Sequence, residues 1–170
     1  MKKPRGHKNT IARSRLLENA ISGLRHLDFH AYKNLAEFNK AAGLFRPERY
    51  LIRNYPHPSL YGTAGRKEAY IWDVGKEYIF EAKLQNSSGS TDEKPVYVFE
   101  CFLVSKIDNW IVWFDGNYWT KNPRGLAGIS WLRDRVTTTQ LANGRAFYIC
   151  ANEDEWVALV DRLFKKKGSL

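Results

Sequence analysis

Apolar residues in the N-terminal part of the chain recur at the spacing of helices. Between residues 11 and 24 they return every three or four positions, which is typical of one face of a helix. A second helix is predicted over residues 32–42, with Gly43 at its end. Prolines and glycines interrupt residues 50–65, so we expect an irregular connection there.

The centre of the chain shows the patterns of strands. Residues 68–72 and 78–84 are rich in β-forming side chains and flank a short turn at Val74-Gly75, which predicts a hairpin. Two later apolar runs, residues 110–114 and 145–151, are too short for surface helices and are expected to be buried strands.

Helical patterns separate and follow these strands. Ser90 or Thr91 can cap a helix that continues to Val104, although its β-forming residues also allow a strand. A short helix is expected over residues 128–136, and Asn152 can cap a last one. This order of elements predicts an α/β fold in which a four-stranded mixed sheet is flanked by helices.

Composition narrows the class of protein. The 170 residues, 44% of them hydrophobic, predict one domain, with basic tails at about residues 1–9 and 165–170. No apolar run approaches the ~20 residues that cross a bilayer, and no signal-peptide pattern follows the first residues, so we expect no membrane partner and a cytoplasmic location. Cys101 and Cys150 lie in apolar runs without zinc-motif spacing and are expected to be inert.

The charge of the chain favours a polyanionic partner. Lys and Arg number 27 against 18 Asp and Glu, which gives a formal charge of +9. Nucleic acid is the leading candidate, and a basic surface that serves solubility is the alternative. The four histidines show no metal-ligand spacing, so a histidine-based catalytic site is not expected.

The candidate chemistry lies at Glu81-Ala82-Lys83. Such a tripeptide is a weak signal by itself, since Asp92-Glu93-Lys94 has the same form. Strand alternation, however, puts Glu81, Lys83 and Gln85 on one face of an otherwise apolar strand, where charges need a reason. An edge-strand Glu-Lys pair that discourages aggregation is the alternative interpretation.

The register of the predicted hairpin supplies a partner for Glu81. A two-residue turn would place Glu68 opposite Glu81, and two facing carboxylates repel unless a divalent cation lies between them. Mg²⁺ is the expected ion, with Mn²⁺ as a substitute, because it prefers oxygen ligands. Asp73 competes as the first carboxylate, but alternation puts it on the other face and roughly 16 Å from Glu68.

These residues resemble the PD-(D/E)XK nuclease superfamily. The matching segments are Tyr61-Gly62, Gly65-Arg66-Lys67-Glu68, Glu81-Ala82-Lys83-Leu84-Gln85 and Ser88-Gly89-Ser90 before Asp92-Glu93-Lys94. The resemblance implies a restriction-endonuclease-like core and Mg²⁺-dependent hydrolysis of phosphodiester bonds. It assigns the first acid to Glu68, the second to Glu81 and the lysine to Lys83. The family's usual first acid is Asp after Pro, whereas here it is Glu after Lys67.

The resemblance also implies roles around this centre. Glu68, Glu81 and the Ala82 carbonyl would hold the metal, while Lys83 positions the attacking water and Gln85 extends the catalytic line. The residues expected to contact DNA are Arg66, Ser88, Ser90 and Lys94, although Ser90 could only cap its helix. Glu18 could add an outer carboxylate or be a solvated helix residue.

The expected function is therefore a DNA endonuclease. Double-stranded DNA is the expected substrate, in restriction, phage genome processing or repair, and cleavage of both strands would favour a homodimer. The alternatives are a non-catalytic nucleic-acid-binding protein on the same fold and a nuclease for branched DNA or RNA.

Overall fold

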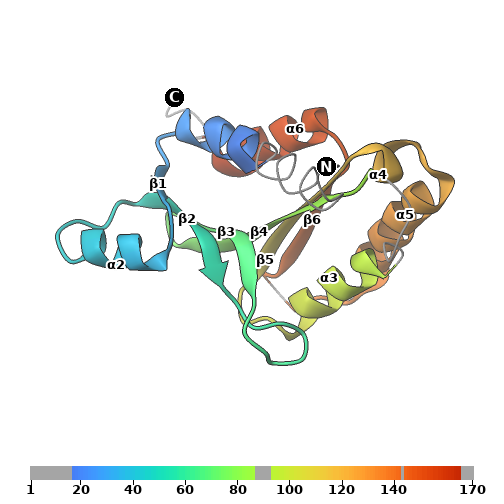
Figure 1. The fold of residues 1–170 in the computed structure, drawn as a ribbon, viewed down its shortest axis with the longest axis horizontal. Coiled ribbons are helices and arrows are strands. Elements are labelled where there is room, and N and C mark those ends of the chain that lie inside the picture. Colours follow the sequence, from blue (N-terminus) through green and yellow to red (C-terminus); the bar gives the residue numbers. More distant parts are fainter. Residues whose placement is uncertain (1–16, 87–92, 143, 166–170) are drawn as a thin grey trace, which may run out of the picture.

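The chain folds into an α/β structure with helices on both faces of one sheet (Figure 1). The computed structural model describes residues 17–86, 93–142 and 144–165. The strands are β1 (His30–Tyr32), β2 (Arg49–Pro56), β3 (Arg66–Asp73), β4 (Lys76–Leu84), β5 (Asn109–Asp115) and β6 (Ala146–Cys150). The helices are one over residues 17–25, then α2 (Leu35–Ala42), α3 (Lys94–Val104), α4 (Asn117–Lys121), α5 (Pro123–Thr138) and α6 (Glu153–Phe164).

The six strands form one mixed sheet in the order β1-β2-β3-β4-β5-β6. Strands β2, β3 and β4 pair antiparallel, while β1 with β2, β4 with β5, and β5 with β6 pair parallel. The four predicted strands correspond to β3, β4, β5 and β6, which lie side by side, so the predicted mixed-sheet core is confirmed. Strands β1 and β2 extend this core at the β3 edge.

The prediction of an irregular connection over residues 50–65 was wrong in its first half. Tyr50, Leu51 and Ile52 are buried β-forming residues that pair with β3, and Pro56 is tolerated because it ends the strand. Only residues 57–65 connect the strands without regular structure. The second helix likewise starts at Leu35 instead of residue 32, because the Asn34 side chain caps it by accepting from the Glu37 N–H.

The predicted helices are confirmed with longer or shifted boundaries. The described part of the first helix covers residues 17–25, and the predicted short helix over 128–136 extends to Pro123–Thr138, capped by Asn122. The predicted helix ending at Val104 begins at Lys94, and its proposed caps Ser90 and Thr91 fall outside the described residues. Asn152 caps α6 as predicted. Among the described residues, no helix is long and apolar enough to cross a membrane.

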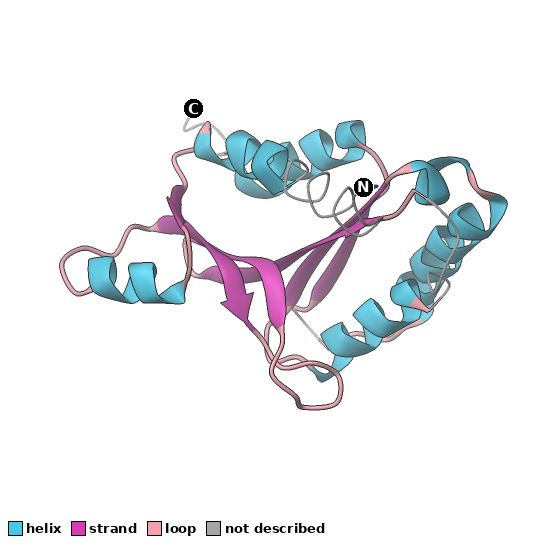
Figure 2. Cartoon of the chain, in the orientation of Figure 1, coloured by secondary structure: helices cyan, strands magenta, loops and turns pink. Residues whose placement is uncertain are grey.

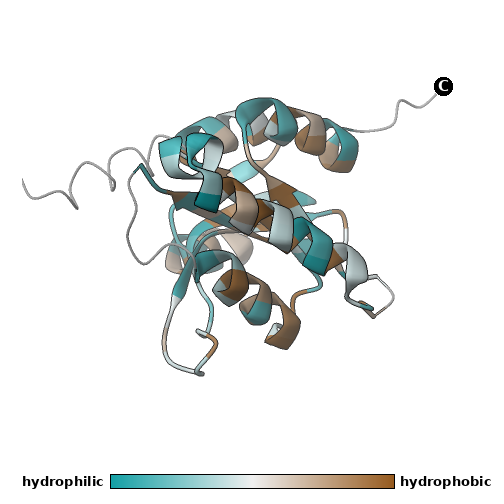
Figure 3. Cartoon of the chain, turned by 90° about the vertical axis from the view of Figure 1, so that its right-hand side faces the viewer, coloured by the Kyte–Doolittle hydropathy of each residue, from teal (hydrophilic) through white to brown (hydrophobic). Residues whose placement is uncertain are grey.

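Two hydrophobic cores hold the layers together. The helix over residues 17–25 packs with α6 on one face of the sheet, and α2, α3 and α5 cover the other (Figure 2). The helices carry hydrophobic residues along part of their surface and hydrophilic residues elsewhere (Figure 3). β4 and β5 therefore run through the interior, and any charged side chain they carry is forced into a desolvated environment.

The hairpin between β3 and β4 fixes the register at the centre of the sheet. Val74 and Gly75 both have positive φ, 44° and 88°, as a two-residue hairpin turn with matching twist requires. The predicted pairs of Trp72 with Glu77 and of Tyr70 with Ile79 are confirmed. Regular pairing of the two strands extends to Ala69 and Phe80.

Candidate active site

Glu81 is a buried carboxylate in the interior of the sheet. It lies on β4 opposite Val112 of β5, and only 5% of its surface is exposed. Strand alternation puts it on the face of Ile79, which belongs to the core under α3 and α5. A carboxylate in such a place must be neutralised by partners or by protonation.

Two lysines provide the partners. The Lys67 ammonium lies 2.9 Å from Oε2 of Glu81, and the Lys83 ammonium bonds Oε1. Lys67 is itself buried, with 6% of its surface exposed, and its Nζ lies 4.7 Å from the centre of the Trp110 ring. This cluster of three side chains carries one more positive charge than negative.

The lysines keep Glu81 ionised. Burial by itself would raise the pKa of the Glu81 carboxyl, but the charges of Lys83 and Lys67 and their hydrogen bonds outweigh burial, and the pKa lies below its ordinary value. The carboxylate is therefore available as an anionic ligand at neutral pH.

Lys67 reaches Glu81 because strand alternation changes next to it. Asn54 of β2 has a positive φ of 49° and lies between two residues paired with β3, Arg53 with Ala69 and Tyr55 with Lys67. Tyr55 stacks on Tyr70 at 4.7 Å, on the same face of the sheet as Glu81. Beyond Asn54, the odd-numbered residue Tyr55 therefore points to the face of the sheet that the even-numbered Tyr70 occupies. Lys67 pairs with Tyr55 and points to the same face.

This change bears on the predicted pairing of Glu68 with Glu81. The contact to Glu81 from β3 is made by Lys67, one residue earlier than strict alternation implies. Glu68 is half-buried on the same strand, immediately beside Lys67. Lys67 was not among the predicted site residues. It lies directly before Glu68, in the run of charged residues that begins β3, and this position is the signal that could have suggested it.

Asp73, the competing first acid, is engaged elsewhere. Its Oδ1 lies 2.6 Å from Nε of Arg49, and both side chains are buried. Arg49 also donates to the Leu27 carbonyl at 2.9 Å and to the Phe164 carbonyl. Asp73 therefore helps to hold β2, β3 and the C-terminal helix together at the turn end of the hairpin.

Gln85 and Lys94 continue the line of polar groups from Glu81 and Lys83. The Lys94 ammonium donates to Oε1 of Gln85 at 2.7 Å, which joins the start of α3 to the end of β4. The backbone of Gln85 is fixed as well, since its N–H donates to Asp115 and its carbonyl accepts from Tyr118. Four of the predicted site residues thus lie in sequence along one strand end and the following helix.

A glycine lets the chain pass close to this strand end. Gly116 has a φ of 97°, and a Cβ at this position would meet the Gln85 carbonyl oxygen. Only glycine fits both the conformation and the space. The turn at Gly116 therefore also holds Gln85 in place.

The remaining predicted residues are placed as follows. Arg66 is exposed at the start of β3, and Ala82 is buried on β4. Glu18 is exposed on the helix over residues 17–25 and forms an ion pair with Arg53 of β2 at 2.5 Å. Ser88 and Ser90 lie outside the described residues.

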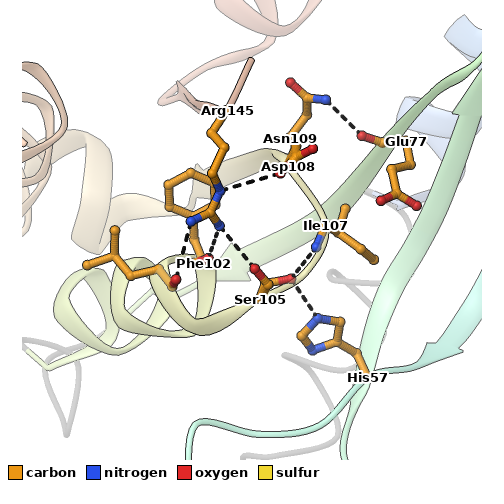
Figure 4. A network of polar contacts seen from close by, with 9 residues as sticks. His57, Glu77, Phe102, Ser105, Ile107, Asp108, Asn109 and Arg145 are labelled. Carbon is orange, nitrogen blue, oxygen red and sulfur yellow. Dashed lines mark hydrogen bonds and ion pairs between the residues drawn. The ribbon is translucent and has the colours of Figure 1, made fainter. Parts of the chain in front are cut away.

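His57 belongs to a network of polar contacts that joins separate elements of the fold (Figure 4). Its Nε2 lies 3.1 Å from the Ser105 hydroxyl, and its Nδ1 lies 2.8 Å from the Pro58 carbonyl. Arg145 donates to the carbonyls of Phe102 and Ser105 at the end of α3, at 2.6 and 3.2 Å. Burial lowers the pKa of His57, and the hydrogen bond with the Pro58 carbonyl acts in the opposite direction. This network anchors the β2–β3 connection and β6 to the end of α3.

The donor set can be compared with what a metal ion requires. No group of three or more His, Cys, Asp or Glu side chains gathers within the part of the chain that the structure describes. Glu81, Glu68 and the Ala82 carbonyl nevertheless offer hard oxygen donors, and Mg²⁺ is commonly held by one or two carboxylates while it keeps several waters. The Glu81 carboxylate could serve as such a ligand only after an ammonium group leaves it, because both of its oxygens accept from lysines.

Comparison with known proteins identifies the family. A family model described as the PD-(D/E)XK nuclease superfamily domain matches residues 12–150, which include every described residue of the site. No curated protein and no solved structure matches the chain. The match agrees with the mixed sheet and with the flanking helices. The chain belongs to the PD-(D/E)XK nuclease superfamily.

Proposed function

We propose that this protein is a Mg²⁺-dependent endonuclease that hydrolyses phosphodiester bonds of double-stranded DNA. The observation that carries the proposal is the buried Glu81 carboxylate with the Lys83 ammonium on it. Such a buried charged cluster adds little to the stability of the fold, because the cost of desolvating the charges offsets the attraction between them. A role in catalysing phosphodiester hydrolysis would explain why the cluster is present.

The residues have distinct roles in this proposal. Glu68, Glu81 and the Ala82 carbonyl would hold the metal ion, which when bound would neutralise charge and lower the pKa of a bound water. Lys83 orients the water and offsets negative charge that develops on the phosphate. Gln85 extends this polar line and is held in place by Lys94.

The proposed DNA substrate is supported by the positive charge of the protein. The formal charge of +9 and the positive excess of the Glu81 cluster both favour a phosphate backbone. Arg66, Lys94, Ser88 and Ser90 are the proposed backbone contacts. Cleavage of both strands with one site per chain would require a second copy, so a symmetric homodimer is part of the proposal.

One observation favours a second function. Both oxygens of Glu81 accept from lysines, which is also how a purely structural ion cluster would look. A nucleic-acid-binding protein that has no hydrolytic activity would keep this cluster intact. The two functions differ in a simple way, because only the nuclease needs the carboxylate for chemistry.

A panel of substrates tests the proposal. Plasmid, linear double-stranded, single-stranded and branched DNA, and RNA, are incubated with the protein and Mg²⁺, Mn²⁺ or EDTA. We expect metal-dependent cleavage of double-stranded DNA, its loss in Lys83→Met, and its retention in Lys40→Met, which removes an exposed charge from α2. Binding without cleavage under all conditions supports the second function, and cleavage of branched DNA or RNA alone corrects the substrate.

A further inference from the structure

We propose that Lys67 is an internal competitor of the metal ion at Glu81. In this proposal Lys67 occupies the carboxylate when no metal is bound, leaves it when a divalent cation binds, and so sets the metal concentration at which the site fills. Lys67 is then a positioning residue that acts through Glu81. The proposal rests on the proposed metal centre and adds a residue to it.

The contacts of Glu81 point to this competition. Each of its two oxygens has an ammonium partner, Lys67 on Oε2 and Lys83 on Oε1. A divalent cation on the same carboxylate would lie within about 4 Å of these groups, where like charges repel strongly at the effective dielectric of a protein. At least one lysine must therefore move for a metal ion to bind.

Within the described residues, Lys67 has a second partner besides Glu81. Its ammonium lies 4.7 Å from the centre of the Trp110 ring, so it can leave the carboxylate and still keep a cation–π contact. Lys67 lies on β3, whereas Glu81 and Lys83 both lie on β4. Lys83 is only two residues from Glu81 and therefore stays beside the carboxylate. This asymmetry leaves Lys83 for catalysis and makes Lys67 the group that exchanges with the metal.

The two lysines also explain how the fold holds a carboxylate in its interior. A buried Glu81 that lacked partners would be strongly destabilising. With both lysines on it, the negative charge of the Glu81 carboxylate is neutralised, and metal binding would replace one positive group with another.

Direct measurement of metal binding tests this proposal. Binding of Mn²⁺, without DNA, is followed by electron paramagnetic resonance and by calorimetry for wild type and Lys67→Met, which keeps most of the side-chain volume and removes the charge. We expect Lys67→Met to bind Mn²⁺ at least about tenfold more tightly. Lys67→Arg retains the charge and should bind like wild type, and Glu81→Gln in the Lys67→Met background should abolish the gain.

The outcomes separate this proposal from the proposed function. Equal or weaker Mn²⁺ binding by a folded Lys67→Met protein overturns the competition, while binding that still depends on Glu81 leaves the metal centre standing. Absence of Mn²⁺ binding in every variant overturns both. Should Lys67→Met fail to fold, Lys67→Gln provides the same test, because its amide can donate to Glu81 without a charge and must also bind Mn²⁺ more tightly than wild type.

Discussion

Removal of the Asp73 carboxylate should destabilise the fold without touching catalysis. Asp73→Ala leaves the Arg49 guanidinium buried without its counterion. Breaking a buried ion pair from one side costs about 3–5 kcal/mol, and we expect the lower end, about 3 kcal/mol, because Arg49 keeps the carbonyls of Leu27 and Phe164. For a domain of this size, the melting temperature should fall by about 6–12 °C.

Thermal unfolding followed by circular dichroism in EDTA measures this loss. The matched control is Asp161→Ala, which removes an exposed carboxylate paired with Lys165 and should cost less than about 1 kcal/mol. A melting temperature for Asp73→Ala equal to that of the control would refute the reasoning about the buried pair.

The same position decides between the two candidates for the first acid. Asp73→Asn, assayed at a temperature where it remains folded, should cleave DNA with wild-type metal dependence, because Asp73 is bound to Arg49 and not to the Glu81 cluster. Glu68→Gln should lose activity under the same conditions. Loss of cleavage in folded Asp73→Asn, with activity retained in Glu68→Gln, would reverse the assignment.

Three further predictions follow from other parts of the structure. Because burial lowers the pKa of His57 below its ordinary 6.5, the unfolded chain binds the proton more readily, and the free energy of unfolding should fall as the pH drops below 6.5. Chemical denaturation of His57→Gln should lack that slope, and an unchanged slope would contradict the assignment. Burial raises the pKa of the Cys150 thiol to about 12, so a thiol reagent at about pH 8 should label it only after unfolding, and rapid labelling of the native protein would count against a buried thiol. Gly116→Ala should lower stability by about 1–3 kcal/mol and slow cleavage, because its Cβ would meet the Gln85 carbonyl. Gly144→Ala has a similar φ of 88° but open space around it, so in urea denaturation and cleavage assays equal losses in the two variants would show that backbone strain alone is responsible.

Elements that depend on local patterns were predictable from the sequence. The turn at Val74-Gly75 needs only two adjacent residues and fixed the pairing of β3 with β4. The run over residues 110–114 is apolar because β5 is covered on both faces, and its composition reveals this directly. Glu81 was identifiable for the same reason, since a charge in an apolar strand is unusual wherever the strand lies.

Features that depend on distant partners could not be predicted. β2 carries Asn54 and Pro56, which are typical of loops, and it becomes a strand because β3 offers a complete row of backbone partners. The position of Lys67 depends on the positive φ of Asn54 on that neighbouring strand, which shifts the alternation of side chains. Strict period-two reasoning assumes uninterrupted alternation of side chains, and it therefore gave Lys67 no place beside Glu81.

The most direct test of the account is the rate of DNA cleavage by Glu81→Gln. The amide keeps the shape of the side chain but cannot serve as an anionic ligand, and wild type, Glu81→Gln and the exposed control Glu153→Gln are compared under single-turnover conditions with Mg²⁺. Cleavage by Glu81→Gln should be at least about a thousandfold slower, while its affinity for DNA in EDTA should stay near that of wild type. Cleavage by folded Glu81→Gln at the rate of Glu153→Gln would contradict the central role of Glu81.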